Sequence, residues 1–145
     1  MDWKIYFLEM TELIAKKSKD PSTKCGAVIV GQDNTIKGCG YNGFPRGIEY
    51  SNEKLQRPAK YKLICHAELN AILNCGRNGV PLLGTTIYIN APPCSDCAKA
   101  IIQSGIEKVI TKKQHVFSNR EDWQESFNLA QQMLDEAGIT YEAIS

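Results

Sequence analysis

Three side chains of the types that bind soft metal ions stand at two predicted helix starts. His66 opens one helix-forming segment, and Cys94 and Cys97 open another within Pro93-Cys94-Ser95-Asp96-Cys97. The two-residue gap lets both sulfurs converge on one ion from the first turn of a helix, where the helix dipole favours the thiolate. Two sulfurs and an imidazole select zinc over hard cations. The pattern therefore predicts a zinc site.

The fourth position of this site decides whether the zinc is structural or catalytic. A structural site closes with a fourth Cys or His, whereas a catalytic site leaves that position to water. Cys75 lies about 13 Å from His66 along the axis of the predicted helix, at ~1.5 Å per residue, which is too far. Cys65 is rotated by roughly 100° from His66 on the same helix. An open fourth position is therefore the better interpretation.

Glu68 follows His66 by two residues and supplies a carboxylate at the same helix start. The two side chains do not stack, but both can border one cavity there. A carboxylate beside a water activated by zinc can take up and return its proton. Two simpler interpretations stay open at this point: Cys94 and Cys97 as a buried or redox-active thiol pair, and Glu68 as an ordinary helix-start charge.

The elements that must position these residues alternate between helices and strands. The first helix, over residues 2–17, has one apolar stripe: Trp3, Tyr6, Phe7, Met10, Leu13 and Ile14. The sequence then predicts a hairpin (25–30 and 35–41), a long loop (42–60), a helix (65–76), a strand (85–89), a helix (97–103), a strand (108–110), a helix (120–136) and a strand (139–144). This order predicts one α/β domain over residues 1–145. Its three-layer α/β/α fold has a mixed five-stranded sheet that opens with an antiparallel hairpin and continues mostly parallel.

Composition narrows the class of protein further. The 145 residues include 17 Lys and Arg against 16 Asp and Glu, a net charge of +1, which disfavours a dedicated nucleic-acid-binding module. No apolar run approaches the ~18 residues of a membrane span, and the first residues lack a secretory pattern, so we expect a cytoplasmic protein. Its cysteines should be thiols, and four are expected to be small buried hydrophobes: Cys25, Cys39, Cys65 and Cys75.

The candidate ligands also form a known signature. His66-Ala67-Glu68, followed after 24 residues by Pro93-Cys94-Ser95-Asp96-Cys97, resembles the H-x-E…P-C-x-x-C pattern of zinc-dependent nucleobase deaminases. Within that superfamily the chain is most similar to the deoxycytidylate (dCMP) deaminase family, through residues 24–30, 40–47, 66–72 and 97–106. The resemblance implies a cytidine deaminase-like fold and one catalytic zinc. It also implies hydrolysis of dCMP to dUMP and ammonia, which supplies dUMP for dTMP synthesis.

The resemblance assigns roles to individual residues. Glu68 would carry a proton from water to N3 of cytosine and then to the departing amine. Asn42 would contact the sugar, and the Ala67 backbone N–H would donate to O2 of the pyrimidine. The candidates for phosphate binding are Ser22, Thr23, Lys24, His115 and Arg120. Taken alone, Asn42 is an ordinary turn residue, and His115 and Arg120 are ordinary surface charges.

The family pattern further implies a homo-oligomer, commonly a hexamer, that is activated by dCTP and inhibited by dTTP with Mg²⁺. The loop expected to take part in this control contains Gly40, Tyr41, Gly43, Phe44 and Arg46. Two other functions stay open. One is a tRNA adenosine, free-base or nucleoside deaminase, which the low net charge disfavours for an RNA substrate. The other is a non-catalytic, zinc-stabilised binding or assembly protein, for which Glu68 has no use.

Overall fold

The computed structural model describes residues 1–113 and 121–145, and the strands in these residues form one sheet with the order β2-β1-β3-β4-β5. The strands are β1 (Gly26–Val30), β2 (Ile36–Tyr41), β3 (Thr86–Ile89), β4 (Lys108–Lys112) and β5 (Thr140–Ile144). The helices are α1 (Trp3–Ala15), α2 (Ala59–Leu63), α3 (Ala67–Arg77), α4 (Ser95–Ser104) and α5 (Glu121–Glu136). All the predicted elements are present. The short helix α2, at the end of the predicted loop, was not predicted.

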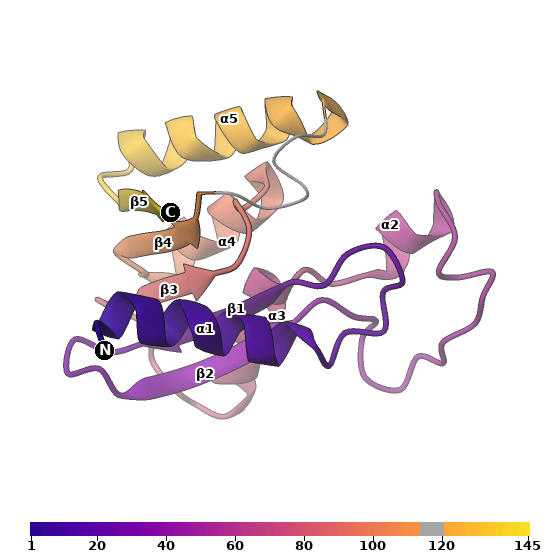
Figure 1. Cartoon of the computed structure of the whole chain (residues 1–145), viewed down its shortest axis with the longest axis horizontal. Helices are drawn as coiled ribbons and strands as arrows, with labels where there is room; N and C mark the ends of the chain where they lie inside the picture. The colour runs from indigo at the N-terminus through magenta and orange to yellow at the C-terminus, as the bar shows by residue number, and fades with distance from the viewer. Residues whose placement is uncertain (114–120) are drawn as a thin grey trace.

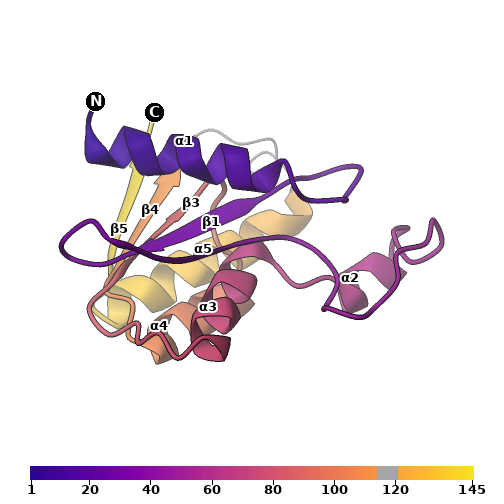
Figure 2. The same cartoon turned by 90° about the horizontal axis from the view of Figure 1, so that it is seen from below.

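The sheet lies between two helical layers, which confirms the three-layer α/β/α prediction. Helix α1 covers one face, and α3, α4 and α5 cover the other (Figure 2). Strand β1 is buried on both faces, because Ala27 and Ile29 belong to the core under α3, α4 and α5, whereas Val28 and Val30 pack under α1. This two-sided burial explains why β1 is an uninterrupted apolar run rather than an alternating one.

The five-stranded sheet is mixed, as predicted, but two of its four strand pairings are parallel rather than most of them. β1 pairs with both β2 and β3 in antiparallel fashion, whereas β3–β4 and β4–β5 are parallel. The cause is the connection through α3, which carries the chain from β2 across β1 to β3. This crossover leaves β2 and β3 running in the same direction, on either side of β1 (Figure 1). The antiparallel opening hairpin itself is confirmed.

The apolar stripe predicted for α1 is only partly buried. Phe7 is a core residue, and Met10 and Ile14 pack against the same cluster. The other members, Trp3, Tyr6 and Leu13, are 56%, 42% and 66% exposed. A Cβ placed on Gly26 of β1 would collide with the backbone of Thr11 and Ala15. The helix therefore meets β1 along its small residues, which leaves part of the stripe outside the contact.

Helix α3 also packs closely on the sheet, against β2. Two amide side chains of the helix donate to β2 carbonyls: Asn70 to Tyr41 O at 2.8 Å and Asn74 to Cys39 O at 2.8 Å. Gly40 lies under the helix between these two bonds. Since α3 begins beside His66, this packing fixes the position of one metal-ligand candidate.

Among the described residues, no helix is long and apolar enough to cross a bilayer.

Gly40→Ala should lower the free energy of unfolding by about 1–3 kcal/mol, the usual cost of overpacking. Its Cβ would lie 2.8 Å from the Asn70 carbonyl carbon and 2.9 Å from the Ala67 carbonyl oxygen, and both are helix backbone atoms. Gly76→Ala is the control, because Gly76 lies in α3 with open space around it, and alanine there should stabilise by up to ~1 kcal/mol. Urea denaturation measures both. Equal stability of Gly40→Ala and the unmodified protein would contradict this packing.

Candidate functional site

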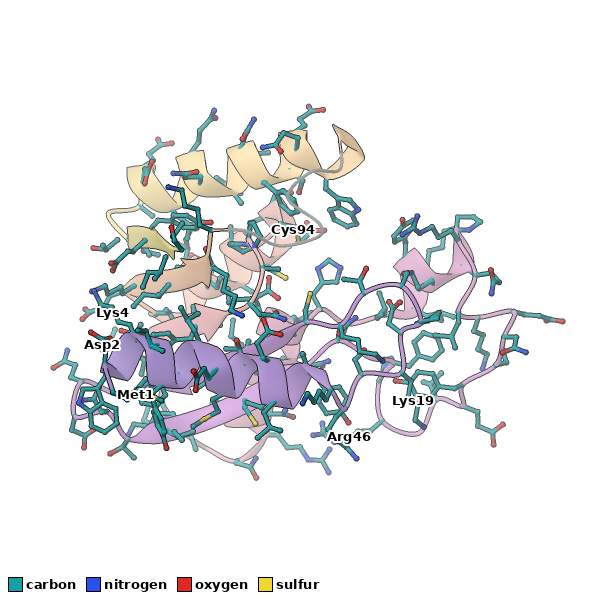
Figure 3. The ribbon with its side chains drawn as sticks, viewed as in Figure 1. Met1, Asp2, Lys4, Lys19, Arg46 and Cys94 are labelled. Atoms are coloured by element: carbon teal, nitrogen blue, oxygen red, sulfur yellow. The ribbon has the colours of Figure 1, made fainter. Side chains whose placement is uncertain are left out.

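Two helix starts bring the three ligand candidates together. His66 is the N-cap residue of α3 and Cys94 is the N-cap residue of α4, while Cys97 lies in the first turn of α4. Neither His66 nor Cys94 uses its side chain to cap its own helix, so both side chains are free to face each other. Figure 3 labels Cys94 at the start of α4. The positive ends of both helix dipoles therefore point toward the same cluster.

The spacing of these atoms fits a tetrahedral zinc ion. The Nδ1 atom of His66 lies 3.4 Å from Cys94 Sγ and 3.6 Å from Cys97 Sγ, and the ligand atoms of the three residues all lie within 4.8 Å of one another. A tetrahedral zinc with Zn–S of about 2.3 Å and Zn–N of about 2.05 Å separates sulfur from nitrogen by about 3.6 Å. Two sulfurs and one imidazole also form the soft ligand set that zinc prefers.

Electrostatics in the cluster favour the thiolate form of a ligand cysteine. A hydrogen bond from the Cys97 thiol lowers the pKa of Cys94 to about 4, against the effect of burial, and His66 acts in the same direction. The same Cys94 sulfur raises the pKa of His66 to about 9 and raises that of Cys97. The three groups thus share protons around a negative charge. A divalent cation binds such a set by displacing those protons.

Glu68 lies in the first turn of α3 and is 5% exposed. Burial raises the pKa of its carboxyl group to about 7, although the nearby His66 opposes the rise. Glu68 belongs to the same cavity as His66 and Cys94. The structure therefore places a buried carboxyl group beside the candidate metal centre, and its part in proton exchange stays a prediction.

The cluster opens into a cavity of about 620 Å³, a volume that includes the open solvent at its mouth. Much of its wall is apolar or aromatic. Tyr61 comes from α2, and Trp123 and Phe127 come from α5, with the Trp123 ring 6.0 Å from the His66 ring and stacked on Phe127 at 6.1 Å. The indole N–H of Trp123 is buried and has no hydrogen-bond partner among the described residues. The cavity can accept a flat ligand that also offers hydrogen-bond acceptors.

Two asparagine side chains hold the floor of this cavity. Asn42, at the end of β2, accepts from Cys25 N at 2.8 Å and donates to Thr23 O at 2.9 Å. Asn90, at the end of β3, accepts from Gly26 N at 3.0 Å and donates to Lys24 O at 3.2 Å. The amide side chains of Asn42 and Asn90 therefore hydrogen-bond the segment before β1 from both sides, as neighbouring strands would. Asn42 also lines the cavity, and its contact with the sugar stays a prediction.

The residues predicted to bind phosphate have different positions. Thr23 lines the cavity, while Ser22 and Lys24 are not among its lining residues. The ammonium group of Lys24 donates to the Ser18 carbonyl oxygen. His115 and Arg120 lie outside the described residues. For these residues the phosphate role stays a prediction.

Two of the residues predicted for effector control, Gly43 and Phe44, lie in a structured turn after β2. The N–H of Phe44 donates to the Tyr50 hydroxyl at 3.1 Å, and the two rings stack at 4.5 Å. Gly43 forms an isolated antiparallel bridge with Cys65. Three predicted members have other surroundings: Arg46 donates to Asn74 Oδ1 on α3 at 2.6 Å, and Gly40 and Tyr41 belong to the β2–α3 contact. Effector binding to this turn stays a prediction.

Sequence analysis missed one wall of the cavity. Asp20, Arg57 and Lys60 line it, and Lys60 is 5% exposed because it pairs with Asp20. No spacing in the sequence marks this pair, since the loop and α2 lack periodicity.

The positions of Trp123 and Phe127 in the cavity did carry a signal in the sequence. Both belong to the apolar face of the last helix, whose later members are core residues.

The cysteines outside the cluster are less uniform than predicted. Cys75 is buried, Cys25 and Cys65 are partly buried, and Cys39 is exposed, so the prediction of a buried thiol is wrong for Cys39. Alternation along β2 explains this difference. Gly38 and Gly40 face α3, and Cys39 between them points away from it.

Comparison with known proteins agrees with this geometry. The family of the cytidine and deoxycytidylate deaminase zinc-binding region matches residues 1–113. Deoxycytidylate deaminase of Pongo abelii is 39% identical over 147 residues, covering 97% of this chain and 79% of that protein. ComE operon protein 2 of Bacillus subtilis is 36% identical over 146 residues, covering 99% of this chain and 72% of that protein.

A solved structure shows the same fold. The apo crystal structure of dCMP deaminase from the cyanophage S-TIM5 superposes with a TM-score of 0.76, at 24% identity and with 97% of this chain and 96% of that chain covered. The family match spans most of the chain and includes the whole His66, Cys94 and Cys97 cluster with Glu68. The chain therefore belongs to the cytidine and deoxycytidylate deaminase family.

Proposed function

We propose that the protein is a zinc-dependent deaminase that hydrolyses dCMP to dUMP and ammonia, and that this dUMP supplies dTMP synthesis. One observation carries the chemistry: His66, Cys94 and Cys97 converge at zinc-binding distances in a cavity that also contains the buried carboxyl group of Glu68. The substrate follows from relatives that are 37–39% identical over 97% of the chain and are named deoxycytidylate deaminase.

His66, Cys94 and Cys97 would hold a zinc ion, which when bound would lower the pKa of water and so supply a nucleophile at neutral pH. Glu68 takes a proton from the attacking water and delivers it to N3 of the cytosine, which makes C4 more electrophilic. After attack at C4, Glu68 takes the remaining proton from the new C4 hydroxyl group and gives it to the amino group, so that the C4–N bond breaks, ammonia leaves and the C4 carbonyl forms. Because Glu68 is only 5% exposed, bulk solvent has little access to the proton that its carboxyl group carries.

The remaining cavity residues orient the substrate. Ala67 is the first residue of α3, where a backbone N–H has no intrahelical acceptor, and it donates to O2 of the pyrimidine. Asn42 contacts the sugar while its bonds to Cys25 N and Thr23 O hold its amide in place. Trp123 offers a ring face to the base beside His66. On the family resemblance, we also propose a homo-oligomer controlled by dCTP and dTTP, with Mg²⁺ bound alongside the effector.

Ammonia release should identify the substrate. The zinc-loaded protein is offered dCMP, deoxycytidine, cytosine and an adenosine-containing tRNA loop at equal concentration, and dCMP is expected to give the highest kcat/KM. Faster release from the tRNA loop or from cytosine would contradict the dCMP assignment. Zinc-loaded, folded protein that is inactive on every compound would favour a binding or assembly role instead.

Glu68→Gln should lower kcat for dCMP by about 10²–10⁴-fold, the usual contribution of a positioned acid–base group. The zinc content should stay at the level of the unmodified protein, because the three ligands are unchanged. Glu53→Gln is the control, since Glu53 is exposed and is not among the cavity-lining residues. Steady-state kinetics and metal analysis measure both effects. A Glu68→Gln enzyme with full activity would remove Glu68 from the mechanism.

Cys97→Ser should abolish stoichiometric zinc binding, because a neutral hydroxyl replaces a buried thiolate ligand. The matched control is Cys39→Ser, which changes an exposed cysteine outside the cluster and should leave one zinc per chain. Metal analysis after dialysis against a weak chelator gives the stoichiometry. Retention of one zinc by Cys97→Ser, or its loss from Cys39→Ser, would contradict the ligand assignment.

A further inference from the structure

We propose that Arg57 and Lys60 bind the 5′-phosphate of the substrate, so that the wall around α2 makes the enzyme select a nucleotide over the corresponding nucleoside. This inference rests on the proposed function, which places a cytosine nucleotide in the cavity. Among the described residues that line the cavity, these two are the only lysine or arginine. Their segment extends from the body of the fold beside the opening strands (Figure 1).

A series of aromatic contacts joins the metal-binding cluster to these two cations. The His66 ring lies 6.0 Å from the Trp123 ring, which lies 6.0 Å from the Tyr61 ring. The guanidinium carbon of Arg57 lies 5.6 Å from the Tyr61 ring centroid, and Lys60 Nζ lies 5.8 Å from it. The cavity therefore has reacting groups at one end of an aromatic wall and positive charge at the other. A flat base with an anionic group at its far end matches this arrangement.

Lys60 is a buried cation with room for one more acceptor. Its ammonium group lies 3.3 Å from Asp20 Oδ2 and 3.4 Å from Asp20 Oδ1, and it donates to Ser22 Oγ at 2.9 Å. An ammonium group has three N–H donors; the two oxygens of the Asp20 carboxylate, at nearly equal distances, can share one of them, and Ser22 takes a second. A buried ion pair contributes little to stability on balance because both charges lose their hydration. Stability therefore does not explain why this pair is buried, whereas phosphate binding does.

Asp20 acts as a positioning residue for Lys60. Burial alone would raise the pKa of Asp20, but hydrogen bonds from the backbone N–H groups of Ser22 and Thr23, together with the Lys60 charge, lower it below its ordinary value. The carboxylate is thus ionised and fixed by its own turn, with Oδ1 at 2.9 Å from Ser22 N and 3.2 Å from Thr23 N. It holds the ammonium group at the cavity wall without neutralising Arg57.

Arg57 supplies the excess positive charge. It is exposed at the edge of the cavity, and its guanidinium group packs over the Tyr61 ring. Stacking on an aromatic ring restricts the planar guanidinium group, whose paired N–H donors suit the oxygens of a phosphate. With Asp20 and Lys60 balanced, Arg57 leaves this wall with a net positive charge. A nucleoside lacks the phosphate group that would interact with this positive charge.

Selectivity between nucleotide and nucleoside tests the proposal. Arg57→Gln and Lys60→Met should each lower kcat/KM for dCMP by about 10- to 100-fold, the range for losing a hydrogen bond to a charged group, and leave kcat/KM for deoxycytidine within twofold. The matched control is Lys62→Met, which removes an exposed lysine of the same helix that does not line the cavity. It should change neither value. A loss that is equal for both substrates, or no loss for either, would overturn the proposal.

Two further variants keep the test decisive. Lys60→Met leaves Asp20 buried without its partner, so Asp20→Asn combined with Lys60→Met removes both charges and should show the same selective loss of dCMP. The ratio of the two kcat/KM values from one preparation does not depend on the fraction of folded protein.

Lys24→Met tests the phosphate position that was predicted from sequence. A selective loss of dCMP in Lys24→Met, without one in Arg57→Gln, would place the phosphate elsewhere.

Calorimetric binding of dUMP and deoxyuridine separates this proposal from the proposed function. The zinc-loaded protein should bind dUMP more tightly than deoxyuridine, and Arg57→Gln should reduce that difference by the same 10- to 100-fold whether or not dCMP is turned over. A failure of dCMP hydrolysis with this binding difference intact would reject the reaction alone. Equal binding of dUMP and deoxyuridine by the unmodified protein would reject the phosphate site alone.

Discussion

The structure depends on bringing two sulfurs of one helix to 3.4 and 3.6 Å from an imidazole nitrogen at the start of another. The topology of the sheet meets this requirement. Because β2 and β3 run in the same direction, their carboxyl ends lie at one edge of the sheet, and the chain leads from there into α3 and α4. Ligands commonly bind at that edge in open α/β sheets. The two helix starts, and the dipoles that favour thiolate, therefore meet where the cavity opens.

Close packing then makes this meeting point rigid. Gly40 lets α3 lie close against β2, and Gly26 lets α1 lie close against β1, because a Cβ at either position would collide with helix backbone. Asn42 and Asn90 bind the chain just before β1 from both sides, which fixes the cavity floor. The same burial that orders these groups surrounds Glu68 with protein and shifts its pKa. Positioning and proton chemistry thus have one physical origin.

Chemistry was easier to predict from sequence than packing direction was. His66, Glu68, Cys94 and Cys97 carry their signal in residue type and short spacing, which survive any error in the strand order. The exposed side of α1 depended on the approach of Gly26 to the helix, a contact between distant parts of the chain. The antiparallel β1–β3 pairing depended in the same way on the path of α3 across β1.

The wall around α2 was the least predictable part of the site. Its segment has no helical or strand period, and Lys60 looks like an ordinary surface lysine until the fold places Asp20 beside it. Cys39 shows the opposite error, since its apolar neighbours in sequence suggested burial although β2 turns it outward. Residues whose role depends on partners 40 or more positions away, as Lys60 and Asp20 are, leave no local pattern.

The central claim is that one zinc ion, bound by this cluster, makes the cavity catalytic. Titration of metal-stripped, folded protein with Zn²⁺, while dCMP turnover is followed, tests it most directly. The account predicts that turnover rises in proportion to added zinc and levels off at one equivalent per chain. Turnover by the metal-free protein equal to that of the zinc-loaded protein would contradict it.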